Sequence, residues 1–457
     1  MTVRSPLSLL FVLFLIVLQQ ATATNAVPAQ QSPEVSFVES TSGPFGAFNG
    51  VTYIRHTGLF EGETSLGAFR VPYEIIAPED TAQSNGAVLV EPPHFIFGPL
   101  GRDYSLGSEF IFTTVSGYAS VGFSEHGLSI LDPTAPGLRL AGEPVANPGA
   151  FNPAGILDEE ILIQFSQALT THAYAQSVLG EVNRLYAYGI SQTVDALLET
   201  RRNLAQTSQQ GLFDFVLLHT ALWPPPPEAQ PAFDFLGTEF QPLDGPGRVL
   251  IVNTEGDLVL SDSEQFRRVD GYSQYRLYEV AGAAHAMSDD NPLDHNAVAR
   301  AIFAAGDHWV RTGEAPPPNT LLETAAPGEI DAVYGVETGI ARDGDLNARG
   351  GVRLPDMAVA RAQFIASDAE TLLPGLPPQF AALSGSMVDL ACEPQAGSGT
   401  DEPRFPNHGA YLSMFTQAVN RLQEQGFLLA PEAEALQEQA AASEVGKPGT
   451  CAALSGK

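Results

Sequence analysis

The most informative segment of this chain is Arg184–Thr193, which has the sequence RLYAYGISQT. In it an apolar and aromatic run ends at Gly189, and Ser191 follows two residues later. A helix-forming run from Val194 to Arg202 comes next. This order is typical of a nucleophile elbow, a sharp turn between a strand and a helix that exposes a serine hydroxyl. The pattern predicts an acid after the next strand but one, and a histidine after the strand beyond that.

A carboxylate occurs where this order requires the acid. Residues 249–253 have the buried-strand sequence VLIVN, and TEGDLV follows at 254–259. A carboxylate just past the carboxyl end of this strand can hold a histidine in the correct tautomer and stabilise its imidazolium form. We prefer Asp257 because it lies past the turn glycine Gly256, and Glu255 is the alternative acid. Whichever of the two is not the acid is expected to be a solvated turn carboxylate.

A histidine occurs where the order requires the base. Residues 275–280, YRLYEV, predict a strand, and the small-residue loop AGAAH follows at 281–285. Small residues let His285 lie against the serine, although a lone loop histidine is usually polar surface. Ser191 is the predicted nucleophile, since serine needs a base within hydrogen-bond reach, and its alternative role is a helix N-cap. Thr193 stands where the usual motif has a second glycine, so we expect its bulk to push the helix slightly away from the strand.

The oxyanion hole of such a site needs two backbone N–H groups aimed at the developing negative charge. One should come from Gln192, directly after the nucleophile. The other should come from the loop after the strand at 87–91. Because Pro92 and Pro93 carry no N–H, we expect His94 or Phe95 to be the second donor.

Strands alternate with helices through the middle of the chain. The expected strands are 87–91, 118–123, 182–188, 213–219, 248–253 and 275–280, and the expected helices are 110–114, 157–179, 192–206, 261–269 and 298–311. This alternation predicts a mostly parallel sheet covered by helices on both faces. Residues 27–85 predict a β-rich N-terminal region with short strands at 35–39, 51–56 and 68–75. The proline-rich segment at about 222–247 predicts a cap whose aromatic side chains line an apolar acyl pocket.

The chain changes character after Gly313. Residues 314–410 are loop-rich, and helices are expected at 411–425 and 431–442. We expect 27–313 to form the catalytic domain and 314–457 to form an extension packed on it. A small second domain is the alternative, but the loop-rich part shows too little periodicity for a core of its own.

The first 26 residues predict an export signal. Arg4 precedes an apolar run at 7–18, and residues 21–23 fit a small-residue cleavage site. The run is shorter than the roughly 20 residues that span a bilayer, so we expect a cleaved signal and a secreted or periplasmic protein, with an uncleaved anchor as the alternative. In an exported protein Cys392 and Cys451 are expected to form a disulfide, and two buried free thiols are the alternative.

The charge balance argues against several classes of partner. The chain has 22 basic and 53 acidic residues, a formal net charge of −31, which repels nucleic acid and anionic lipid surfaces. The sequence at 343–347, DGDLN, begins like a calcium loop, but position twelve is Leu354, so we interpret it as a turn. We expect no cofactor, no bound metal and no membrane span after signal cleavage. The oligomeric state is left open.

These motifs together resemble the bacterial α/β-hydrolase-domain proteins, which are secreted or cytoplasmic. The likeness covers nearly the whole mature chain. The segments that carry it are EGE at 61–63, VEPPH at 90–94, GISQT at 189–193, AGAAH at 281–285, GGVRLP at 350–355 and GFLL at 426–429. The resemblance implies a serine hydrolase with an α/β-hydrolase fold, in which the Ser-Gln-Thr elbow is normal and the tail is an integral part.

From the residues and the resemblance we expect an exported serine hydrolase that cleaves small-molecule or polymer esters. Its triad would be Ser191, His285 and Asp257, and the reaction would pass through an acyl-enzyme. An amidase or peptidase with the same triad is one alternative. A non-catalytic binding protein with the same fold is the other.

Overall fold

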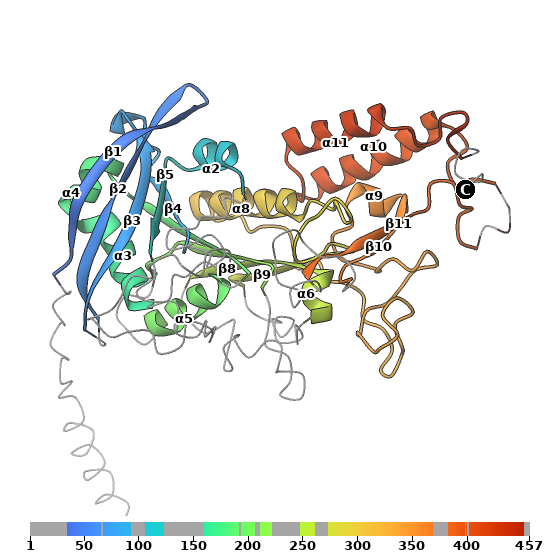
Figure 1. Ribbon diagram of the computed structural model, residues 1–457, viewed down its shortest axis with the longest axis horizontal. Coiled ribbons are helices and arrows are strands. Elements are labelled where there is room, and N and C mark those ends of the chain that lie inside the picture. The colour runs from blue at the N-terminus through green and yellow to red at the C-terminus, as the bar shows by residue number, and fades with distance from the viewer. Residues whose placement is uncertain are drawn as a thin grey trace, which may run out of the picture. The chain divides into compact units, whose positions relative to one another are not determined.

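One sheet organises the chain in the computed structural model (Figure 1). Its strands are β1 Ser36–Phe48, β2 Val51–Thr64, β3 Gly67–Pro78, β4 Ala87–Val90, β5 Gly117–Val121, β6 Arg184–Ile190, β7 Phe215–His219, β8 Arg248–Thr254 and β9 Tyr275–Val280. Among the described residues their order is β1-β2-β3-β5-β4-β6-β7-β8-β9. The pairs from β1 to β5 are antiparallel, and all pairs from β5 to β9 are parallel. The prediction of a mostly parallel sheet with a β-rich N-terminal region is therefore confirmed.

The structure describes the following residues: 34–64, 67–92, 106–122, 159–191, 193–205, 211–221, 247–260, 273–368, 383–397, 399 and 402–451. The predicted signal peptide, the predicted helix at 261–269 and nearly all of the predicted cap lie outside these ranges. The division into a catalytic domain at 27–313 and an extension at 314–457 stays a prediction.

Helices cover both faces of the sheet, as the alternation predicted. The main helices are α2 Ser108–Thr114, α3 Glu159–Thr171, α4 Ala173–Leu179, α5 Thr193–Ala205 and α8 His295–Thr312. Buried side chains of α2 and α8 belong to one core, and those of α3, α4 and α5 belong to the other. Figure 1 shows where these helices lie along the sheet. Strand β7 is apolar throughout because both of its faces are buried. Phe215 and Leu217 pack in the core on one face of the sheet, and Val216 and Leu218 pack in the core on the other face.

The sequence of helix α8 accounts for its two ends and for its buried face. Asp294 caps its N-terminus and accepts a hydrogen bond from the N–H of Ala297 at 3.1 Å. Val298 and Ile302, four residues apart, are fully buried on the sheet. Gly313 ends the helix with a φ of +81°, a conformation that favours glycine.

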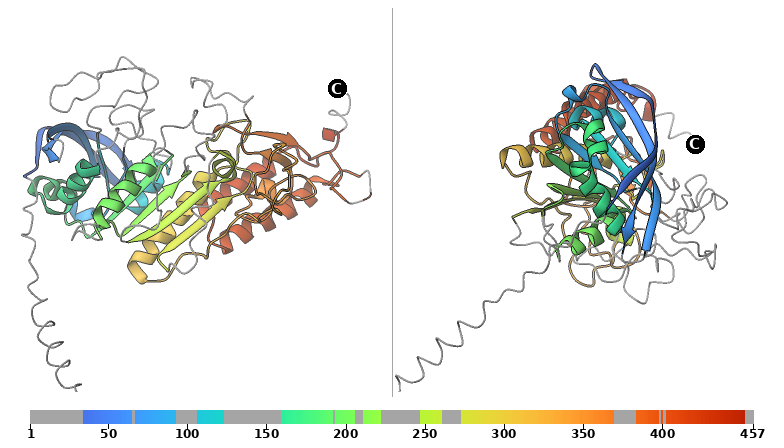
Figure 2. Two further views of the ribbon diagram at one scale, coloured as in Figure 1. Left: turned by 90° about the horizontal axis from the view of Figure 1, so that it is seen from below. Right: turned by 90° about the vertical axis from the view of Figure 1, so that its left-hand side faces the viewer.

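Two parts of the sequence prediction were wrong in detail. The single helix expected at 157–179 is two helices, because His172 adopts an extended conformation and its side chain accepts a hydrogen bond from the N–H of Tyr174. The N-terminal strands are longer than expected, since β2 and β3 pair without interruption from Tyr53↔Pro78 to Thr64↔Gly67. Figure 2 shows these long strands curving at one end of the sheet.

The chain after Gly313, which we call the C-terminal extension, packs on the sheet. Its elements are α9 Pro355–Ala358, β10 Ala362–Ile365, β11 Ser386–Asp389, α10 His408–Glu424 and α11 Ala430–Ala442. Thr320 and Val352 form parallel bridges with Tyr278 and Val280 of β9. The ring of Phe427 lies 5.4 Å from that of Tyr278, so the extension and the sheet share one hydrophobic core.

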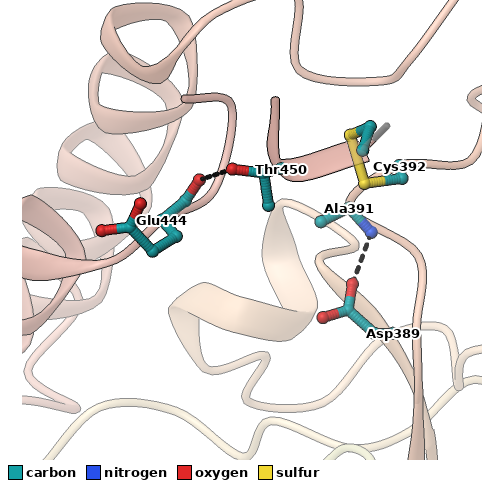
Figure 3. The surroundings of a disulfide bond; sticks show 6 residues. Asp389, Ala391, Cys392, Glu444 and Thr450 are labelled. Carbon is teal, nitrogen blue, oxygen red and sulfur yellow. Dashed lines mark hydrogen bonds between the residues drawn. A yellow bond between two sulfur atoms is a disulfide. The ribbon is translucent and has the colours of Figure 1, made fainter. Parts of the chain in front are cut away.

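A disulfide joins Cys392 to Cys451, as predicted, and closes a loop across a sequence separation of 59 residues. The backbone N–H of Ala391 beside it donates to Asp389, and the hydroxyl of Thr450 donates to the carbonyl of Glu444 (Figure 3). The cross-link ties the segment after α11 to the segment after β11.

Within the ranges that the structure covers, no helix combines the length and the apolar character that crossing a bilayer requires.

Candidate active site

Ser191 occupies a strained turn between β6 and α5. Its φ is +51°, in the left-handed region that non-glycine residues rarely adopt. Two backbone hydrogen bonds hold the turn: the Ser191 N–H donates to the carbonyl of His219 at 2.9 Å, and the Val194 N–H donates to the carbonyl of Ser191 at 3.0 Å. Strain of this kind persists only where the surrounding structure enforces it, and it is common at active sites.

Gly189 and Thr193 make this turn possible. A Cβ on Gly189 would lie 2.9 Å from the carbonyl oxygen of Thr193, so only glycine fits beneath the helix. The buried Thr193 hydroxyl accepts a hydrogen bond from the N–H of Ile190 at 2.7 Å and donates to its carbonyl at 2.8 Å. The threonine that we expected to push the helix away thus binds the end of the strand.

Three side chains from three segments form one hydrogen-bonded chain. The Ser191 hydroxyl lies 2.8 Å from Nε2 of His285, and Nδ1 of His285 lies 2.6 Å from Oδ1 of Asp257. Asp257 is fully buried, the His285 side chain is 5% exposed, and Ser191 is partly exposed. The structure therefore brings the predicted nucleophile, base and acid together, with only the serine open to solvent.

The acid turn, residues 254–257, orients the carboxylate of Asp257. It contains the start of helix α6, Glu255–Leu260, which the sequence did not predict. Oδ2 of Asp257 accepts a hydrogen bond from the N–H of Thr254 at 2.7 Å, while Oδ1 faces the histidine. Because Oδ1 can only accept, Nδ1 of His285 carries the proton, and Nε2 is left to accept the serine proton.

Glu255, the alternative acid, has other partners. Its Oε1 lies 2.5 Å from the guanidinium of Arg342, and its Oε2 accepts a hydrogen bond from the N–H of Gly282 at 2.7 Å. Burial raises the pKa of Glu255, and the Arg342 guanidinium opposes that shift. The expectation of one solvated turn carboxylate was wrong, because Glu255 and Asp257 are both fully buried.

The predicted oxyanion-hole donors Gln192, His94 and Phe95 lie outside the described residues, as do the aromatic side chains expected to line the acyl pocket. Their roles stay predictions.

A second buried polar chain lies beside the triad and was missed by the sequence analysis. The Tyr188 hydroxyl lies 2.8 Å from Nδ1 of His219, and Nε2 of His219 lies 2.8 Å from Nδ1 of His295. Burial lowers the pKa of His295 to about 4 and lowers that of His219 well below its usual value. His219 ends an apolar strand and His295 opens a helix, and neither pattern shows that they meet.

The predicted turn at 343–347 pairs its acids with arginines. Asp343 binds Arg353 at 2.9 Å, and both carboxylate oxygens of Asp345 bind Arg404. The N–H groups of Asp345 and Asn347 donate to Oδ1 of Asp343, which closes the turn. Among the residues placed by the structure, no group of three or more side chains is arranged to hold a metal ion.

Comparison with known proteins points to one family. Residues 70–438 match the family described as alpha/beta hydrolase domain. The structure of esterase Est22 is 14% identical, covers 68% of this chain and 89% of that chain, and has a TM-score of 0.37. The structure of an arylesterase is 12% identical in sequence, and its match covers 55% of this chain and 84% of that chain with a TM-score of 0.36. The structure of a fungal esterase from Rhizomucor miehei is 9% identical in sequence, and its match covers 62% of this chain and 84% of that chain with a TM-score of 0.35. No curated protein matches the chain.

Proposed function

Because the chain belongs to the alpha/beta hydrolase domain family, we propose that it is a serine hydrolase that cleaves carboxylic esters. The observation that carries this proposal is the hydrogen-bonded chain from Ser191 through His285 to Asp257. A serine hydroxyl is a weak nucleophile unless a base takes its proton, and this arrangement supplies the base and the group that orients it.

The geometry supports a two-step reaction. Nε2 of His285 removes the proton of the Ser191 hydroxyl as the oxygen attacks the ester carbonyl carbon. The imidazolium then gives that proton to the departing alcohol, which leaves an acyl-serine. Water attacks the acyl-serine with His285 again as the base, and the carboxylic acid and free Ser191 result. Asp257 stays ionised throughout and stabilises the imidazolium.

The N–H of Gln192, with that of His94 or Phe95, would bind the oxyanion that forms in both steps. Esters rather than amides are proposed because an alcohol leaves the tetrahedral intermediate more readily than an amine does. The substrate is a small-molecule or polymer ester, and the proline-rich segment at 222–247 would cover its acyl group.

We also propose export to a secreted or periplasmic location. The apolar N-terminal segment at 7–18 supports this, and so does the disulfide between Cys392 and Cys451, because disulfides persist mainly in oxidising compartments.

A direct test is hydrolysis of short p-nitrophenyl esters by the wild type and by Ser191→Ala. Ser177→Ala is the matched control, since its hydroxyl only donates to a helix carbonyl in α4. We expect the wild type and Ser177→Ala to release p-nitrophenol at the same rate and Ser191→Ala to be inactive. Equal rates in the wild type and Ser191→Ala would overturn the proposal. Faster cleavage of matched p-nitroanilides would assign the site to an amidase instead.

A further inference from the structure

The acid turn binds the histidine loop, residues 281–286, through each of its last three residues. The Glu255 carboxylate accepts a hydrogen bond from the N–H of Gly282 at 2.7 Å. The N–H of Gly256 donates to the carbonyl of Ala283 at 3.0 Å. The next residue of the turn is the acid that binds His285. The hydrogen bond between Asp257 and His285 is therefore one of three that fix the histidine loop on this turn.

The histidine loop is also enclosed by the C-terminal extension. A Cβ on Gly256 would lie 2.8 Å from the backbone nitrogen of His285 and 2.8 Å from the carbonyl oxygen of Ala366, so turn, loop and extension are in direct contact. The N–H of Ala286 donates to the carbonyl of Leu383 at 2.8 Å. The loop forms no helix or strand, so these contacts set where the imidazole lies.

Arg342 of the extension holds Glu255 in this arrangement. Its guanidinium binds Glu255 with Nη1 and binds Asp331 with Nε and Nη2, at 3.0 and 2.6 Å to one carboxylate oxygen. The Arg342 side chain is 8% exposed, and the two carboxylates are almost fully buried. Ionised carboxylates remain in such surroundings only when they are paired. A planar guanidinium binds both through donors on three nitrogens in a fixed geometry, whereas an ammonium offers its donors from a single nitrogen.

The position of Arg342 is itself fixed from within the extension. The ring of Tyr334 lies 5.4 Å from the guanidinium carbon, and the Tyr334 hydroxyl accepts a hydrogen bond from the N–H of Ala366 at 3.0 Å. Ala366 also lies against Gly256 of the acid turn, and Gly256 in turn lies against the backbone of His285. One buried polar cluster therefore connects the extension with the loop that bears the base.

We propose that Arg342 is a positioning residue for the reaction: through Glu255 and the N–H of Gly282 it keeps His285 aligned between Ser191 and the triad acid. The C-terminal extension would then take part in catalysis as well as in folding. This inference rests on the serine-hydrolase function proposed above. Alignment matters because a base displaced by about 1 Å loses roughly 100-fold in rate.

The test compares the same substitutions in two buried arginines of the extension. Arg342→Lys keeps the charge and loses the planar fork, and Arg342→Met removes both. Arg404 is the control, because it is 4% exposed and binds both carboxylate oxygens of Asp345, and among the described residues none of its side-chain partners belongs to the acid turn or to the histidine loop. We expect kcat on a p-nitrophenyl ester to fall about tenfold or more in Arg342→Lys and further in Arg342→Met, with KM changed by less than about twofold. Arg404→Lys and Arg404→Met should keep the wild-type kcat.

A second measurement does not depend on the substrate. The proton between His285 and Asp257 should give a far low-field proton NMR signal in the wild type and in both Arg404 variants. We expect the signal to weaken or shift in Arg342→Lys. If the wild type hydrolyses no ester but the low-field signals of the variants change as expected, the result would contradict the proposed function and support the positioning role.

Two results would overturn the inference: an Arg342→Lys variant with wild-type kcat and an unchanged low-field signal, or a loss of kcat no larger than that of Arg404→Lys. Absence of the low-field signal from the wild type would contradict the hydrogen bond on which the inference depends. If Arg342→Met does not fold, Arg342→Lys decides the question by the same two measurements.

Discussion

The parallel half of the sheet and the C-terminal extension share an apolar core, and they differ in their buried polar contacts. Strand β7 is buried along its whole length, and its side chains alternate between the two apolar cores. In the extension, by contrast, Arg342, Arg353 and Arg404 each bind an aspartate through the guanidinium. Apolar packing sets where the strands end, because it fixes their register and direction. The polar contacts of the extension set how the histidine loop lies on those ends.

This difference predicts that substitutions in the two regions have separable effects. Changes among the triad side chains at the strand ends should remove activity at little cost in stability. Changes in the cross-links of the extension should lower stability and spare the chemistry, unless they reach the histidine loop.

The largest expected effect is that of Asp257→Asn. With one oxygen, the amide cannot accept hydrogen bonds from both the Thr254 N–H and Nδ1 of His285, and it carries no charge to stabilise the imidazolium, so kcat should fall by ~10⁴-fold. The two side chains have nearly the same shape, so the free energy of unfolding should fall only by about 1–3 kcal/mol, the cost of one unmatched buried polar group. Steady-state kinetics and urea unfolding of the same preparation check both points. An Asp257→Asn enzyme that keeps most of its kcat would show that another carboxylate is the acid.

Removal of the disulfide should lower the free energy of unfolding and leave kcat unchanged. The double variant Cys392→Ser/Cys451→Ser opens a loop of 59 residues, and its free energy of unfolding should fall by ~4 kcal/mol. Its kcat below the unfolding transition should equal that of the wild type. Urea denaturation measures the first quantity, with the reduced wild type as control. A folded double variant with low kcat would mean that the cross-link also shapes the site.

The buried histidine pair predicts a loss of stability in acid. Burial lowers the pKa of His295 from 6.5 to about 4, so between these values the unfolded chain binds more protons than the folded one. This contribution is fully present above pH 6.5 and is lost as the pH falls towards 4, on the order of 3 kcal/mol. Free energies of unfolding at pH 7.5 and pH 4.5 measure it, and His295→Gln should show a smaller difference. Equal differences in both proteins would rule out this source.

The smallest expected effect concerns the elbow. Thr193→Val leaves the buried N–H of Ile190 without its acceptor, which should cost about 1–3 kcal/mol of unfolding free energy. Thr200→Val in the same helix is the control, because the buried Thr200 hydroxyl donates only to the carbonyl of Ala196. Calorimetry or urea unfolding compares the two. If Thr200→Val loses as much stability as Thr193→Val, the threonine has no special role in the elbow.

The parts of the fold that local pattern controls could be predicted from the sequence. Strand β9 lies at 275–280 as expected, since its apolar residues and flanking turns define it locally. The triad could be located because its three residues follow the carboxyl ends of β6, β8 and β9, three parallel strands of one sheet. Helix α6 could not, because Thr254–Gly256 has the sequence of a turn, and the helix that starts at Glu255 was not expected there.

The long-range polar contacts could not be predicted either. Glu255 and Arg342 are 87 residues apart in the chain, and nothing near either residue indicates the other. Glu255 was expected in solvent because its sequence is that of a turn, and the extension buries it. The meeting of His219 and His295 was missed for the same reason, since side-chain partners across elements depend on how those elements pack.

In this structure His285, held by the sheet and by the extension, is placed to activate Ser191. The most direct measurement is labelling by a fluorophosphonate probe, followed by intact mass and peptide mapping. We expect one label per wild-type chain, located on Ser191, with none in Ser191→Ala and much slower labelling in His285→Gln. A folded wild type that takes up no label, or a Ser191→Ala variant labelled as fast as the wild type, would contradict this activation of Ser191.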